Sequence, residues 1–154
     1  MNEFSRWNVN DALQAAANVV IIVGGIGVGL WTLNNARSDA IADNRAALVQ
    51  VWTNEGDILA TETRFITLEL QDYSGDLIGT LRGPGFDATF DVQVDVGWRS
   101  SELHITELRG RSAQPVGTVK VKLLGNHNRL QWELDDSSPD YLPRSTALWI
   151  SPSL

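Results

Sequence analysis

The chain has 154 residues and a formal net charge of −7, with 12 basic against 19 acidic residues. This balance gives no long-range positive field, so binding to a nucleic-acid polymer is disfavoured. The absence of cysteine excludes disulfides, thiolate metal sites and thiol chemistry, and it fits either redox compartment. The length suffices for one domain of about 100 residues in addition to an N-terminal helical region.

The N-terminal region contains a long stretch without charge, from Ala12 to Ala36. A bilayer core of about 30 Å needs roughly 20 helical residues, which this stretch supplies. We therefore predict a juxtamembrane segment over residues 1–14 and a transmembrane helix over residues 15–34. A cleaved signal peptide is the alternative. An uncleaved anchor is favoured because the one basic residue before the span, Arg6, is offset by two acidic residues, and no cleavage site closely follows the span.

Three residues of the predicted span favour contact between copies. Gly25 and Gly29 have the small-xxx-small spacing that lets two helices approach closely, and Asn18 is a polar group that lipid does not satisfy. They predict a homo-oligomer formed through this face. The alternative is that glycine is common in membrane helices and that Asn18 reaches headgroup water. Basic residues flank both sides of the span, so the positive-inside rule does not set its orientation.

The helical pattern continues beyond the predicted span. Over residues 35–53, apolar side chains recur at helical spacing on one side and charged side chains on the other, without Pro or Gly. This pattern predicts a helical stalk. Asn54, Gly56 and Asp57 are the first cluster of turn residues, so the barrel domain is expected over residues 54–154.

From Thr63 onward the hydrophobic period becomes two, which is typical of strands with one buried face. About eight such segments alternate with turn signals, among them Gly83-Pro84-Gly85 and Gly110 to Pro115. An eight-stranded antiparallel up-and-down barrel, which is lipocalin-like, removes the open edges of such a meander. The first strand is expected at residues 51–54 or 58–61. The others are expected around Ile66 to Leu70, Asp76 to Arg82, Phe90 to Trp98, Leu103 to Ile105, Val119 to Leu123, Leu130 to Leu134 and Ser145 to Ile150.

The short turn around Asn126 predicts a register for the two strands beside it, because a two-residue period fixes which side chains share a face. The expected pairs are Lys120 with Glu133 and Lys122 with Gln131 on the outer surface, with Val121 and Trp132 inside.

Residues able to carry out catalysis are scarce. His104 lies on the polar side of its strand and His127 at a hairpin tip, and no third ligand is indicated beside them, so both are expected to be solvated. Ser100 and Ser101 precede His104 without the strand-turn-helix elbow of a hydrolase. Gly83-Pro84-Gly85 opens no helix and is followed by no lysine, which makes it a structural turn. We predict no catalytic residue, no metal and no cofactor.

Arginines at strand ends form the candidate ligand site, because the guanidinium group suits bidentate contact with phosphate and an indole ring can stack on a base. An eight-stranded barrel is just wide enough for its own side chains, so a ligand is expected at the rim or between copies. The alternative is that each arginine pairs with a nearby carboxylate on a solvated surface. The candidate residues are Arg82, Arg99, Arg109, Arg111, Trp98 and Trp132.

This order of parts resembles the membrane-anchored β-barrel effectors of bacterial cyclic-oligonucleotide antiphage signalling (CBASS). The resemblance rests on architecture over the whole chain; those effectors are expected to have two spans, one more than predicted here. It implies a barrel in the cytosol, anchored in the bacterial inner membrane. It also implies that a cyclic nucleotide binds the barrel and drives oligomerisation and membrane disruption, with the rim arginines as phosphate contacts and Gly25, Gly29 and Asn18 as assembly contacts.

Two other functions compete with this one. The first is a non-enzymatic accessory or scaffold subunit of a bacterial envelope complex, in which the barrel is a docking platform without a small ligand. The second is a lipocalin-like carrier of an apolar ligand, which requires an open barrel interior.

Overall fold

The computed structural model describes residues 30–55, 65–83, 86–109, 112–135 and 142–151. The chain divides into two compact units, residues 1–39 and 40–154. In the first unit the described residues, 30–39, are helical and exposed. In the second, helical residues 40–48 precede an all-β domain. Within these described ranges no helix combines the length and apolar character that a membrane span needs, and the predicted span lies outside them apart from residues 30–34.

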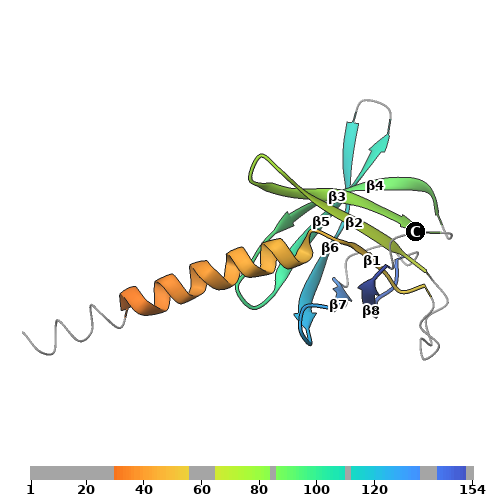
Figure 1. The fold of residues 1–154 in the computed structure, drawn as a ribbon. Coiled ribbons are helices and arrows are strands. Elements are labelled where there is room, and N and C mark those ends of the chain that lie inside the picture. Colours follow the sequence, from red (N-terminus) through yellow and green to blue (C-terminus); the bar gives the residue numbers. More distant parts are fainter. Residues whose placement is uncertain (1–29, 56–64, 84–85, 110–111, 136–141, 152–154) are drawn as a thin grey trace, which may run out of the picture. The chain divides into compact units, whose positions relative to one another are not determined.

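Eight antiparallel strands close into a barrel in which each strand pairs with its neighbours in sequence and the last pairs with the first (Figure 1). This confirms the predicted up-and-down barrel. The strands are β1 (Val51–Thr53), β2 (Thr67–Tyr73), β3 (Asp76–Gly83), β4 (Phe86–Asp95), β5 (Ser101–Arg109), β6 (Ser112–Leu124), β7 (Arg129–Leu134) and β8 (Ser145–Ile150).

The barrel interior is filled by apolar side chains. Alternate residues of each strand point inward, and those of the described strands join one core whose largest members are Trp52 and Trp132, both wholly buried. The predicted register of β6 and β7 is confirmed, because Lys120 pairs with Glu133 and Val121 with Trp132. A slip of one residue would bury the lysines, so the hydrophobic pattern and the turn specify the same pairing.

The closing strand lies where the sequence predicted the end of the stalk. The helix ends at residue 48, and Val51–Thr53 pair with both β2 and β8, so the predicted stalk over residues 35–53 is too long and the barrel begins before residue 54. A bend at residues 49 and 50 redirects the chain, and the Leu70 amide donates to the Gln50 carbonyl (3.1 Å). Of the two predicted positions for the first strand, this one is confirmed; residues 58–61 lie outside the described residues.

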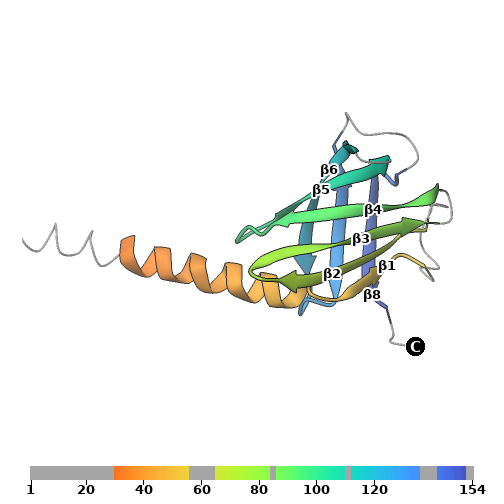
Figure 2. The same ribbon diagram turned by 90° about the horizontal axis from the view of Figure 1, so that it is seen from above.

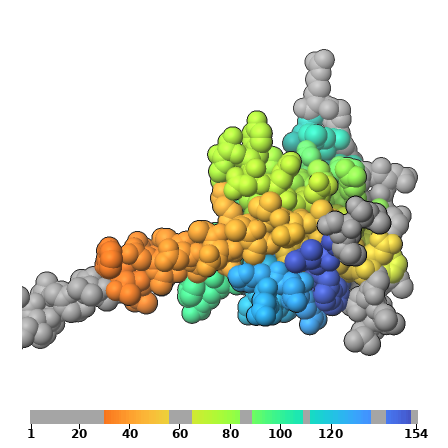
Figure 3. Space-filling view, in the orientation of Figure 1, coloured from red at the N-terminus to blue at the C-terminus, as the bar shows by residue number. Residues whose placement is uncertain are grey.

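Two other strands differ from their predicted limits. β4 ends at Asp95, so Trp98 is not an inward strand residue, and its side chain is 41% exposed. β6 begins at Ser112, so Pro115, predicted in a turn, lies in the strand opposite Thr106 beside a register shift. The adjoining ends of β5 and β6, teal in Figure 3, lie at the surface of the barrel.

Consecutive connections of an up-and-down barrel lie at alternate ends. The β2–β3, β4–β5 and β6–β7 connections therefore share one end with helix residues 40–48, which lead into the start of β1 (Figure 2). We call this the helix end. The β1–β2, β3–β4, β5–β6 and β7–β8 connections share the other end, which we call the far end.

Asn54, directly after β1, is a wholly buried polar residue. Its Oδ1 accepts a hydrogen bond from the Ile66 amide (2.7 Å), and its Nδ2 donates to Thr146 Oγ1 (3.4 Å). The side chain thus joins β1 to the segment before β2 and to β8. These bonds support the closure, which β1 otherwise maintains with three residues.

The substitution Asn54→Ala should lower the free energy of unfolding by about 1–3 kcal/mol, because it leaves the buried Ile66 amide without this acceptor. Urea unfolding of the full chain, followed by circular dichroism, measures the change. Asn126→Ala, in the exposed β6–β7 turn, is the matched control and should change stability by less than about 0.5 kcal/mol. Equal effects of the two substitutions would contradict this role of Asn54.

Candidate functional site

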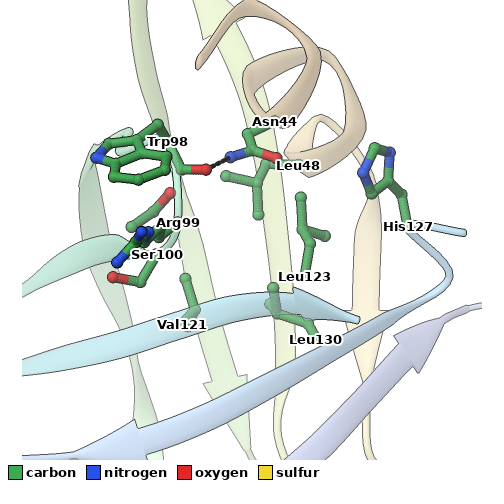
Figure 4. A pocket seen from close by; sticks show the side chains of 10 residues that line it. Asn44, Leu48, Trp98, Arg99, Ser100, Val121, Leu123, His127 and Leu130 are labelled. Carbon is green, nitrogen blue, oxygen red and sulfur yellow. Dashed lines mark hydrogen bonds between the residues drawn. The ribbon is translucent and has the colours of Figure 1, made fainter. Parts of the chain in front are cut away.

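A pocket opens at the helix end of the barrel, between the helix, the β4–β5 connection and the β6–β7 hairpin (Figure 4). Its volume is about 110 Å³. Pockets for drug-sized ligands begin at roughly 300 Å³, so this one has room for a single ring or a phosphate-sized group, with the rest of any larger ligand outside it.

The helix provides one wall of the pocket through Asn44 and Leu48. Asn44 Nδ2 donates to the carbonyl oxygens of Gly97 (2.9 Å) and Trp98 (3.3 Å), which both belong to the β4–β5 connection. The neighbouring Arg45 binds Asp72 (3.3 Å) and the Gly75 carbonyl at the β2–β3 turn. The last turns of the helix are therefore attached to two of the three connections at this end.

The β4–β5 connection presents a cation stacked on an aromatic ring. The Arg99 guanidinium lies 4.0 Å from the centroid of the Trp98 ring, and both side chains are exposed. Stacking restricts the guanidinium without using its hydrogen-bond donors, which stay available to an anion. Arg99 is also the permanently charged residue of the pocket lining, so the local potential favours an anionic group.

The rest of the pocket is amphipathic. Figure 4 shows Leu48, Val121, Leu123 and Leu130 between Trp98 and Arg99 on one side and His127 on the other. His127 lies in the hairpin turn with a φ of 61°, a left-handed backbone conformation that is uncommon for residues other than glycine. Apolar residues between polar groups suit a ligand that combines a ring or short apolar part with an anionic group.

Topology divides the predicted arginine cluster between the two ends of the barrel. Arg99 lies at the helix end, whereas Arg82, near the end of β3, and Arg109, the last residue of β5, lie at the far end. Arg82 is exposed. Arg111 lies outside the described residues. Arg99 is therefore not brought together with Arg82 and Arg109, because alternate connections of the meander lie at opposite ends of the barrel.

Of the two predicted aromatic contacts, one remains available to a ligand. Trp98 is half-exposed in the pocket, whereas Trp132 is wholly buried and its Nε1 donates to the Pro143 carbonyl (2.8 Å). Trp132 therefore belongs to the core and presents no face to solvent. The predicted assembly residues Asn18, Gly25 and Gly29 lie outside the described residues.

The clearest contact between titratable side chains outside the pocket joins β5 to the end of β4. His104 faces outward from β5, as predicted, and its Nε2 lies 3.0 Å from Asp95 Oδ2. Among the residues that the structure describes, no group of three or more His, Asp or Glu side chains is placed to hold a metal ion. Comparison with protein families, with curated proteins and with solved structures finds no match to this chain.

Sequence reasoning missed Asn44, His127, Ser100 and Ser101 as pocket residues. The signal was present in the order of the strands, since an up-and-down meander places the second, fourth and sixth connections at one end. Counting connections would have grouped Arg99 with His127 and separated it from Arg82. The helix wall was not predictable in this way, because it depends on where the helix ends.

The substitution Asn44→Ala should detach the helix from the β4–β5 connection by removing two half-exposed hydrogen bonds. The expected cost is about 1 kcal/mol in unfolding free energy, with faster amide exchange confined to helix residues 44–48 and residues 96–100. Hydrogen exchange read by mass spectrometry measures it. Asn35→Ala, at an exposed position of the same helix, controls for helix propensity. Uniformly faster exchange over all strands would contradict a local role.

Proposed function

We propose that this protein is a membrane-anchored, non-enzymatic sensor that binds a phosphate-bearing ligand at the helix end of its barrel. The observation that carries the proposal is the double role of Asn44, which lines the pocket and also bonds the loop that holds Trp98 and Arg99. A ligand in this pocket touches both the helix and the loop attached to it. Its binding free energy therefore acts on the contact between helix and barrel.

The filled interior supports binding at the rim. The wholly buried Trp52, Trp132 and Leu103 belong to one close-packed core. A lipocalin-like carrier of an apolar ligand requires space inside the barrel, so this function is the least supported of the three. The pocket's stacked Arg99 and Trp98 offer a cation for a phosphate and an exposed ring for a base. The cyclic nucleotide that the architectural resemblance implies carries both groups.

Membrane anchoring has support in the helix residues at the end of the predicted span. Leu30, Trp31 and Leu33 are 63%, 68% and 59% exposed, although all three are large and apolar. Neighbouring apolar side chains left in water are unfavourable and typically mark a contact surface. Tryptophan is also enriched where a span meets the headgroups. In the proposed sensor, the face with Gly25 and Gly29 then assembles copies in the inner membrane.

A scaffold subunit is the second candidate, and the hairpin of β5 and β6 favours it. The strands of this hairpin project from the barrel (Figure 1). Its Leu108 is 62% exposed. A projecting ribbon with an exposed leucine is suited to a protein partner. A reporter fused after Leu154 separates the two candidates, because a periplasmic C-terminus fits the envelope scaffold and excludes a sensor of cytosolic nucleotides.

Calorimetric titration of the full chain in detergent micelles with a panel of cyclic di- and trinucleotides tests the ligand. At least one should bind, and Arg99→Ala should weaken it about tenfold or more, since a charge-assisted hydrogen bond contributes about 1.5–3 kcal/mol. Arg82→Ala removes an exposed arginine at the far end and should leave the affinity unchanged. Absence of heat with every nucleotide would contradict this ligand class, and equal losses in both variants would contradict this pocket.

Membrane extraction tests the anchor. The native chain should stay in the pellet after carbonate washing and enter solution only with detergent. Val23→Arg, at the centre of the predicted span, should shift the chain toward the soluble fraction, because arginine there costs about 2.5–3.5 kcal/mol on insertion. Ser38→Arg, beyond the span, serves as control. A native chain that carbonate releases would contradict the anchor.

A further inference from the structure

The barrel has two small seams, one on each side of β1. β1 pairs with β8 through two residue pairs and with β2 through three, whereas β5 pairs with β6 through nine. Strands β2 to β8 follow one another as antiparallel neighbours, so β1 alone closes the sheet. Residues 54–66 connect β1 to β2, a far longer connection than the two to five residues of a tight hairpin. The chain between β1 and β2 is thus much longer than the turn of a tight hairpin.

The segment that makes this closure is one short, continuous stretch of the chain. We call residues 44–54 the closing segment. Within it, Trp52 Nε1 donates to the Leu48 carbonyl (3.1 Å), which joins the helix end to β1. Leu48 and Trp52 are both buried in the core. Asn54 forms hydrogen bonds with Thr146 of β8 and with the Ile66 amide before β2. Leu48, Trp52 and Asn54 all belong to eleven consecutive residues, so one short segment supplies all of these side chains to the barrel.

We propose that the closing segment is exchanged between two copies of this chain, each completing the other's barrel between β2 and β8. Every contact in the exchanged dimer is one that the closed monomer already makes, and the segment precedes the other strands, so exchange requires no threading. The partner is a second copy because it presents the same two strand edges and the same cavity for Leu48 and Trp52. Edges without β1 are open backbone ladders that favour such pairing.

The exchange has a consequence for the pocket. Asn44 and Leu48 belong to the closing segment, while Trp98, Arg99 and His127 belong to the rest of the barrel. In the exchanged dimer each pocket is therefore lined by two copies. This inference needs no ligand and does not depend on the proposed sensing function, so the two are tested separately.

Disulfide trapping between single-cysteine chains tests the exchange, and the lack of native cysteine makes the readout unambiguous. Val51 and Ser151 lie opposite each other across the seam on the β8 side, where the Ser151 amide donates to the Val51 carbonyl (2.7 Å). Full chains carrying Val51→Cys and full chains carrying Ser151→Cys, with tags of different mass, are co-expressed, purified in detergent and oxidised. A disulfide joining the two kinds of chain forms when β1 of one copy lies beside β8 of the other.

The matched control is the pair Lys122→Cys and Gln131→Cys, which are opposite in register on β6 and β7 but belong to one hairpin with a short turn. We expect the seam pair to give about five-fold or more of the inter-chain disulfide of this control. A chain carrying both Val51→Cys and Ser151→Cys calibrates the seam geometry. Inter-chain disulfide at the control level overturns the proposal, whether the double variant closes within one chain or fails to close.

Discussion

Closure of the sheet around an apolar interior is the constraint on which the rest of the domain depends. Seven strands form a continuous meander, and its two outer edges would expose unpaired backbone groups and the inward side chains beside them. β1 removes both edges with three residues, and its Trp52 enters the core without residual exposure. The three residues of β1 thus determine whether the domain is a closed barrel or an open sheet with two unpaired edges.

The same segment joins the barrel to the helix. Because Leu48 and Trp52 enter one core and are joined by a hydrogen bond, closing the barrel fixes the last turn of the helix. Asn44 and Arg45 then attach the preceding turn to two connections of the barrel. Anything that changes these connections acts directly on the helix. Any sensing role for this protein is therefore physically most direct at the helix end.

The sequence predicted most of the barrel because strands with one buried face have a regular signal. The Lys120 and Glu133 pairing and the limits of β8 at Ser145 and Ile150 follow from alternation bounded by turn residues. The predicted helical stalk was extended over the residues of β1, because three residues contain no readable period and Val51 also fits helical spacing from Leu48. Trp98 was placed inside since it continues the alternation of β4, although the strand already ends at Asp95.

The site was less predictable than the fold because it depends on which strand ends meet. Arg99 and His127 are separated by two strands in sequence and line one pocket because the β4–β5 and β6–β7 connections lie at the same end of the barrel. Sequence parity also placed Trp132 inside, and the burial of its ring excludes it from ligand contact. A filled core resists deformation, so a ligand bound at the far end would have to act on the helix through close-packed side chains. A ligand at the helix end needs only to alter the hydrogen bonds of Asn44, which is the physical reason to favour Arg99 over Arg82 and Arg109 as the phosphate contact.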